Sequence, residues 1–178
     1  MTRPSAAKCP ANTIRCVRAG GVATAALLLT VLACASAPIV ETAVLRPDVD
    51  FASLRSFAIV SAEDQQGQTH RDIEDAIRAA LTERGLASLD IDRADMVVAY
   101  RASAVDRQKR KMSSDPDANS YRIVDYVEGT LVIDVFSRHV ASRIWHGQAI
   151  VDEANREKLR ARKVDAVEAV LGELPLGD

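Results

Sequence analysis

The chain has 178 residues, of which 48% are hydrophobic, 27% are charged and only 4% are aromatic. This length and composition predict one globular domain with an aliphatic core, and they exclude a chain that is disordered throughout. The formal net charge is −2, and aromatic side chains are too sparse for a surface that stacks single-stranded nucleic acid.

The first 33 residues have the pattern of a secretory signal. Residues 1–18 contain four basic residues and no acidic one, and the uncharged segment GGVATAALLLTVLA follows at 20–33. This segment is shorter than the roughly 20 residues that a membrane-spanning helix needs. It ends in Val31-Leu32-Ala33-Cys34, which resembles the lipobox of bacterial lipoproteins. The resemblance implies lipid transfer to Cys34 and cleavage before it; a plain signal peptide or an uncleaved anchor helix is the alternative.

The use of cysteine agrees with this interpretation. Cys9 and Cys16 would leave with the signal, and no cysteine follows Cys34. The mature chain of 145 residues would therefore form no disulfide of its own, and its one cysteine suits lipidation. Ala35, rather than an aspartate, follows the cysteine, which resembles sorting to the outer membrane.

Cleavage would also change the charge of the protein. It removes four of the 23 basic residues and none of the 25 acidic ones, so the net charge becomes −6. An acidic domain is a poor binder of a phosphate backbone. We therefore expect no nucleic-acid partner.

After a predicted tether over residues 34–41, alternating patterns predict a single domain over residues 42–178. Residues 42–48, which Pro47 would end, and residues 54–60 have the composition of strands. A helix is predicted over residues 69–84, because apolar residues recur at helical spacing: Ile73, Ala76, Ile77, Ala80 and Leu81. Thr69 and Asp72 resemble a capping box, and Gly85 is placed to end this helix.

A third strand is predicted over residues 94–104, and a long polar segment follows it. Residues 105–126 begin with a basic cluster of Arg107, Lys109, Arg110 and Lys111. We expect this segment to be a solvated loop, and contact of the cluster with anionic lipid head groups is the alternative.

The last part of the chain predicts a strand pair and a second helix. Strands are expected over residues 129–136 and 143–151, and the connection at 137–142 leaves their register open. The helix over residues 155–171 has the apolar stripe Leu159, Val164, Val167, Val170 and Leu171. Together the elements predict an α+β fold: a two-layer sandwich whose mostly antiparallel sheet of about five strands carries two helices on one face.

The order of these segments resembles a family of envelope lipoproteins called domain of unknown function 4136. The resemblance is carried by DFASLRSFAIV at 50–60, ADMVVAY at 94–100, YVEGTLVIDVFSRHVASRIWHGQA at 126–149 and AVEAVLGELP at 166–175. The chain departs from the family at residues 137–141, where the family has an Asp-x-x-Thr-Gly turn, and in the loop 105–120, which lacks the usual aromatic and glycine residues. The resemblance implies an envelope location and this architecture, and it supplies no established reaction.

Groups that could carry chemistry are few. His70, His139 and His146 lack the spacing of paired metal ligands, so we expect neither a metal nor a cofactor. Asp134 and His146 would face each other in one possible hairpin register. They would then form either a base with its orienting group or a cross-strand polar pair on the solvent face, and the polar pair explains the same facts with less. Trp145, the only tryptophan, is expected in the core.

We therefore expect a non-enzymatic protein of the cell envelope that binds an envelope protein or helps to maintain the envelope. It would face the periplasm and be held at the outer rather than the inner membrane through lipid on Cys34. An accessory lipoprotein of a lipid or solute transport system is the second hypothesis, and an enzyme is the third. An apolar pocket between sheet and helices would favour the second, and a cleft that gathers Asp134, His146 and Glu128 the third. A flat edge strand or an exposed apolar patch would favour the first.

Overall fold

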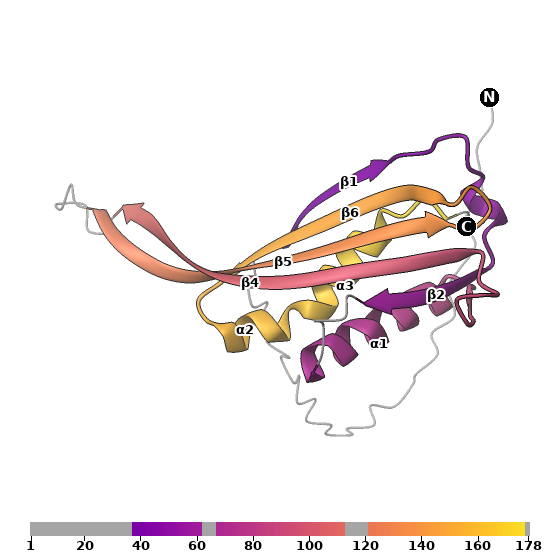
Figure 1. Cartoon of the computed structure of the whole chain (residues 1–178). Coiled ribbons are helices and arrows are strands. Elements are labelled where there is room, and N and C mark those ends of the chain that lie inside the picture. Colours follow the sequence, from indigo (N-terminus) through magenta and orange to yellow (C-terminus); the bar gives the residue numbers. More distant parts are fainter. Residues whose placement is uncertain (1–36, 62–66, 113–120, 177–178) are drawn as a thin grey trace, which may run out of the picture. The chain divides into compact units, whose positions relative to one another are not determined.

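One six-stranded sheet, with helices on one of its faces, forms the part of the chain that the computed structural model describes, residues 37–61, 67–112 and 121–176. The strand order is β1-β6-β5-β4-β2-β3 (Figure 1). The strands are β1 Ile39–Val44, β2 Ser56–Ser61, β3 Ala87–Ser88, β4 Met96–Met112, β5 Tyr121–Ser137 and β6 Ser142–Glu153. The helices are the 3-10 turn η1 Phe51–Ser53, α1 Gln68–Glu83, α2 Arg156–Ala161 and α3 Lys163–Gly172.

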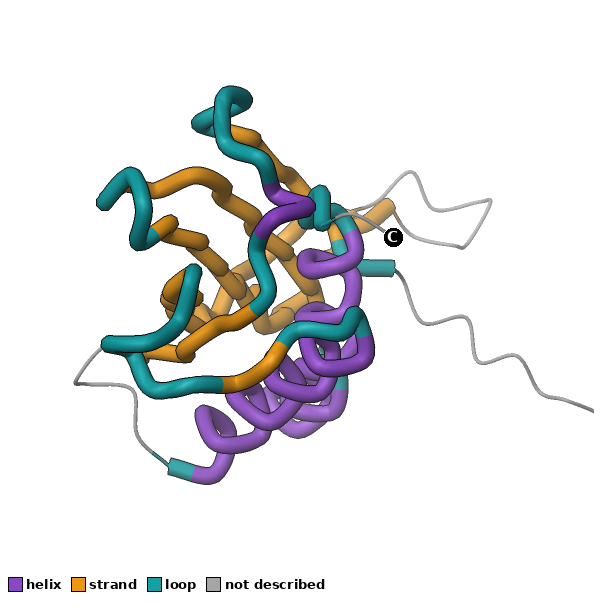
Figure 2. The backbone as a smooth tube through the Cα atoms, turned by 90° about the vertical axis from the view of Figure 1, so that its right-hand side faces the viewer, coloured by secondary structure: helices purple, strands orange, loops and turns teal. Residues whose placement is uncertain are grey.

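The predicted α+β fold is confirmed. Strands β1, β6, β5 and β4 pair antiparallel, whereas β2 is parallel to both β4 and β3. Parallel strands need a long crossover connection, and α1 supplies it between β2 and its two parallel neighbours. The helices lie on one side of the strands (Figure 2). The sequence predicted about five strands, and the two-residue β3 makes the sixth.

The core lies between the sheet and the helices, and period-two alternation selects the residues that enter it. Leu131, Ile133 and Val135 share one face of β5 and are buried. Trp145 of β6 is completely buried, which confirms its predicted place in the core. Gly147, Ala149 and Val151 follow Trp145 on the same face of β6, and all three are buried.

Helix α1 follows the predicted stripe, but its first turn differs from the prediction. Its buried residues are Ile73, Ile77 and Leu81, and Gly85 ends it with φ of 84° as expected. The capping box is wrong: the N-cap is Gly67, and no side chain caps the helix. Because the helix begins at Gln68, Thr69 lies inside the first turn, and Asp72 instead accepts hydrogen bonds from Gln68 and Lys163.

The predicted second helix is divided at Arg162 into α2 and α3. Asn155 caps α2, and its side-chain oxygen accepts a hydrogen bond of 2.9 Å from the backbone N–H of Lys158. Val167, Val170 and Leu171 are buried as predicted. Val164 is an error of the prediction, because it is 40% exposed. The break at Arg162 changes the helical phase, and Ala166 takes a buried position instead.

The segment 105–126 is not the loop that its polarity predicted. Strand β4 continues to Met112 and β5 begins at Tyr121, so the described parts of the segment form an antiparallel ribbon (Figure 1). Nearly all of its residues are exposed, including the apolar Met112, Tyr121 and Ile123, so it lacks the buried apolar face whose alternation marks a strand in sequence. Cross-strand contacts replace core packing: Arg107 bonds Glu128 at 3.1 Å, and the Lys109 ammonium lies 4.4 Å from the Tyr126 ring centroid.

Two further boundaries differ from expectation. Strand β1 begins at Ile39 and pairs with Ile150 of β6, so residues 39–41 belong to the sheet rather than to the predicted tether. The connection between β5 and β6 contains Ala141 with φ of 47°. This turn settles the register that the sequence left open, and Asp134 lies opposite His146.

Candidate functional site

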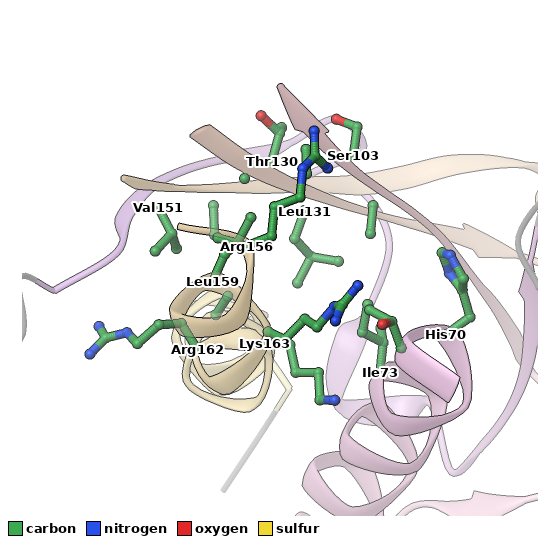
Figure 3. Close-up of a pocket in the computed structure, with 17 residues that line it drawn as sticks. His70, Ile73, Ser103, Thr130, Leu131, Val151, Arg156, Leu159, Arg162 and Lys163 are labelled. Atoms are coloured by element: carbon green, nitrogen blue, oxygen red, sulfur yellow. The ribbon is translucent and has the colours of Figure 1, made fainter. Parts of the chain in front are cut away.

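A pocket of about 290 Å³ lies between the sheet and the N-terminal parts of α1 and α2 (Figure 3). Three strands form one wall, and three helices form the others. Its lining residues are Thr69, His70 and Ile73 of α1; Ala102, Ser103 and Ala104 of β4; Gly129, Thr130 and Leu131 of β5; Ala149 and Val151 of β6; Arg156, Leu159 and Arg160 of α2; and Arg162, Lys163 and Ala166.

The pocket exists because the sheet carries very small side chains at this place. Ala104 is paired with Gly129, and on the same face Leu131 lies between Ala102 and Ala149. Because these side chains are short, they do not fill the distance between the sheet and the helices, and a cavity remains there. At Gly129 a methyl group would lie 2.5 Å from Cδ1 of Leu159, which shows how closely α2 approaches the sheet at the edge of the pocket.

Basic side chains surround the apolar interior. The lining includes four cationic residues, Arg156, Arg160, Arg162 and Lys163, and no acidic residue among those described. All four belong to the segment that runs from the start of α2 to the first turn of α3. Whether these charges attract an anion depends on their acidic partners, because paired charges compensate each other.

Three of these cations have acidic partners outside the pocket. Arg156 donates to Asp106 Oδ2 at 2.8 Å, and Lys163 pairs with Asp72. The hydrogen bond from Lys163 is the main cause that lowers the pKa of Asp72. Arg162 points away from His70 in Figure 3, and its Nε lies 3.4 Å from Asp165 Oδ2 and 3.9 Å from Glu153 Oε1 of β6.

Arg160 differs from the other three cations. It is exposed, and it forms no ion pair with any residue that the structure describes. An arginine of this kind keeps all of its donors for solvent or for a ligand. It is therefore the most available positive charge of the pocket.

His70 contributes an unusual polar group to the α1 side of the pocket. Its Nδ1 is buried and has no hydrogen-bond partner within residues 37–61, 67–112 and 121–176. Its ring stacks on Tyr100 with centroids 6.2 Å apart, and the Tyr100 hydroxyl donates to Glu74 Oε1 at 3.1 Å. Burial, helped by Glu74, raises the pKa of Tyr100 to about 12, so this phenol stays protonated. This nitrogen is therefore a buried polar atom without a partner among the described residues.

The structure brings together the predicted pair of Asp134 and His146. His146 Nδ1 lies 2.8 Å from Asp134 Oδ1, and Arg143 donates to the same oxygen at 2.9 Å. Asp134 alternates with the inward residues of β5, so the pair lies on the sheet face that the helices leave open. Neither residue lines the pocket. The contacts are those of a cross-strand polar pair, extended by an arginine.

The cleft that would have favoured an enzyme does not form. Glu128 is six residues from Asp134 along β5, which corresponds to roughly 20 Å in a strand. It pairs with Arg107 at 3.1 Å instead. His139 lies 3.7 Å from Asp95, far along the chain from His70, and the described residues include no group of three metal-ligating side chains.

The predicted lipidation site, Cys34, lies outside the described residues. Among the described helices, none combines the length and the apolar character needed to cross a membrane. The basic cluster of residues 107–111 belongs to β4, where Arg107 and Lys109 pair with Glu128 and Asp152.

Sequence reasoning missed the pocket itself. Two signals were available: small residues at inward positions of three strands, and the basic segment REKLRARK at 156–163. Neither signal is informative alone, because alanine is common in strands and arginine on exposed helices. Only the register of β4, β5 and β6 shows that the small residues are neighbours.

The fold and the site define a two-layer α+β domain with a basic pocket between its layers. The chain belongs to the family described as a domain of unknown function (DUF4136), which its sequence matches over residues 42–176. A search of curated proteins gives no match.

Solved structures share the fold at low sequence identity. A PDZ domain protein from Parabacteroides distasonis is 14% identical with a TM-score of 0.59; the similarity covers 80% of this chain but only 37% of that protein. A variant of the PelC dodecamer from Paraburkholderia phytofirmans is 10% identical with a TM-score of 0.52, covering 79% of this chain and 99% of that one. At these identities the likeness concerns the fold alone.

Proposed function

We propose that this chain is a lipid-anchored, non-enzymatic protein of the cell envelope that binds a small ligand in the pocket between its sheet and helices. Lipid on Cys34 would hold it at the outer membrane, facing the periplasm. Of the roles considered above, an accessory component of a lipid or solute transport system is the one that a pocket favours. The pocket is the single observation that carries this choice.

Several features support a binding role over catalysis. Small-molecule sites are concave and mostly apolar, with a few polar groups that orient the ligand, and the pocket has this character. Its volume of about 290 Å³ is near the lower end of the usual range for such sites. The only predicted acid–base pair, Asp134 with His146, is on the other face of the sheet and is held by Arg143. Because the Asp134 carboxylate accepts a hydrogen bond from Arg143 as well, it is suited to a structural role.

The proposed anchor rests on the sequence before β1. Two or three acyl chains bind a membrane firmly, because each buried methylene contributes about 0.8 kcal/mol. Ile39, the first residue of β1, lies five positions after Cys34. An extended chain of that length spans at most about 18 Å, so the domain would remain close to the membrane surface.

The anchor is tested by Cys34→Ser. We expect the variant to lose metabolic labelling with palmitate and to leave the membrane fraction. Cys16→Ser is the matched control, because Cys16 lies within the predicted signal and should leave both properties unchanged. A Cys34→Ser protein that still fractionates with the membrane would overturn the anchor.

The pocket is tested by filling it. Ala104→Leu places a larger side chain at a pocket wall, and Val105→Leu places the same side chain on the opposite face of β4. Native mass spectrometry of the full chain, released gently from the envelope, should detect a bound small molecule in the wild type and in Val105→Leu. The bound mass should be absent from Ala104→Leu. Its presence in all three proteins, or in none, would contradict a ligand in this pocket.

A further inference from the structure

We infer that the ligand of this pocket is an amphiphile with a single short acyl chain and an anionic head group. This inference rests on the proposed function, because it names the ligand class for the same pocket. Three observations point to this chemistry. They are the apolar interior of the pocket, the cationic side chains of its lining, which we call its basic mouth, and the buried Nδ1 of His70.

The apolar interior fits an acyl chain. Ile73, Leu131 and Leu159 present branched aliphatic groups to the cavity, and Gly129 and Ala149 leave the wall of the sheet open. These aliphatic groups offer dispersion contacts and no hydrogen bonds, which suits a hydrocarbon chain packed against them.

The size of the cavity limits the length of that chain. An apolar cavity of about 150 Å³ holds one benzene ring. A volume of about 290 Å³ is nearly twice as large and corresponds to roughly a dozen carbon atoms by the same scale. Two long acyl chains would not fit, so a diacyl lipid could insert only part of itself.

The basic mouth fits an anionic head group. Four cationic side chains line the pocket and none of its described lining residues is acidic. Arg156 and Lys163 already have carboxylate partners, whereas Arg160 has no ion-pair partner among the described residues. We therefore assign the main head-group contact to Arg160, whose planar guanidinium can donate two parallel hydrogen bonds to a carboxylate or phosphate.

The buried nitrogen of His70 adds a second polar contact. It lies on the α1 side of the pocket, across from the arginines of α2 (Figure 3). A rotation of the imidazole ring toward the pocket would let this nitrogen, which is buried in this structure, bond a head-group oxygen or a bound water. A head group held between His70 and the arginines of α2 would place the acyl chain along the sheet, beside Ala104, Gly129 and Ala149.

A free fatty acid and a lysophospholipid each have one acyl chain and an anionic head group. Their ability to displace one fluorescent probe from the pocket distinguishes the two. The probe is dansylaminoundecanoic acid, whose fluorescence increases in an apolar site. The protein is the full chain with Cys34→Ser, which removes the acyl groups that would compete for the pocket. Dodecanoate and lysophosphatidylglycerol test the two sources, dodecanol tests the chain without charge, and inorganic phosphate tests the head group alone.

We expect dodecanoate, lysophosphatidylglycerol or both to displace the probe at concentrations about tenfold lower than dodecanol, with no displacement by phosphate. Arg160→Gln should raise the required concentration of the anionic competitors about tenfold and leave dodecanol unchanged. Lys158→Gln is the matched control, because Lys158 is an exposed cation of the same helix that does not line the pocket. Ala104→Leu should weaken every competitor with an acyl chain.

The outcomes separate this inference from the proposed function. Any of three results would overturn the anionic amphiphile. They are equal competition by dodecanol and dodecanoate, displacement of the probe by phosphate, and an Arg160→Gln protein whose affinity for the anionic competitors is unchanged. So would failure of the probe to bind. If native mass spectrometry still finds a bound mass that Ala104→Leu removes, the proposed function stands and only the ligand class is wrong. If no bound mass and no probe binding are found, both are wrong.

Discussion

The helix-covered face of the sheet has two halves that differ in how closely they are packed. Around Trp145 the layers meet without space, and a methyl group built on Gly147 would lie 2.6 Å from Val170 Cγ1 and closer still to the indole. Around Gly129 only the end of the Leu159 side chain approaches the sheet, and the pocket opens beside it.

The difference shows how one arrangement of strands serves two purposes. Both halves contain an inward glycine, but the indole of Trp145 covers Gly147 two residues away on the same strand. No aromatic side chain lines the pocket apart from His70; Leu159 covers Gly129, and the pocket remains beside it. The packed half supplies stability, and the open half is free to bind a ligand.

The largest expected effect is that of Trp145→Ala. Removal of a completely buried indole leaves a cavity in the packed half, and such substitutions cost about 3–5 kcal/mol. We expect denaturant unfolding, followed by circular dichroism, to show this loss. Leu159→Ala at the pocket should cost clearly less, because Leu159 is only partly buried. Equal losses would mean that the two halves do not differ in packing.

A smaller effect is expected from the two glycines, which give the most direct comparison. Gly147→Ala forces the indole or Val170 to move and should cost about 1–3 kcal/mol. Gly129→Ala meets the mobile end of Leu159, which can rotate into the pocket, and should cost less than about 1 kcal/mol. The midpoints of urea unfolding measure both. A larger loss for Gly129→Ala would reverse the assignment of the two halves.

A pH-dependent effect is expected at Asp95, which precedes β4 at the packed end. Its carboxylate accepts hydrogen bonds of 3.0 Å from the backbone N–H groups of Arg55 and Ser56 and one of 2.8 Å from the Ser56 hydroxyl. These bonds, led by that of Arg55, lower the pKa of Asp95 in the folded state. Its contribution to stability is therefore present above the unfolded pKa of about 3.9 and is lost as the pH falls through the lower folded value.

Asp95→Ala should accordingly destabilise the protein by about 1–2 kcal/mol at pH 7. The difference between variant and wild type should shrink below about pH 4, where the wild type also loses its charged acceptor. Unfolding free energies measured from pH 7 down to pH 3 give this comparison. A difference that stays constant across this range would show that the charge of Asp95 has no part in stability.

How far the sequence predicted the fold depended on whether a signal was local. The stripe of Ile73, Ile77 and Leu81 predicted α1 because helical spacing is a property of one segment. Alternation in residues 129–136 predicted a strand and the residues that share each of its faces for the same reason, whereas the structure shows which face is inward. The polar ribbon of β4 and β5 was predicted as a loop, because its strands are held by each other and not by an apolar face.

The candidate site was predicted only in fragments. Asp134 and His146 were recognised as a pair that one register would join, and the structure supplies that register. The pocket has contributions from α1, from three strands and from the segment 156–166, and no two of these segments are linked by local spacing. Cys34 remains a prediction from its local motif.

The sequence by itself determined the elements with strong periodicity, the acidic character of the domain and the lipobox-like motif that ends in Cys34. These properties depend on residues close together in the chain. The tertiary structure alone decided that Ala104, Gly129 and Ala149 are neighbours and that the arginines of α2 lie above them. The physical reason is that strand register and helix placement arise from packing between distant segments, and a cavity is defined by the side chains that such packing leaves absent.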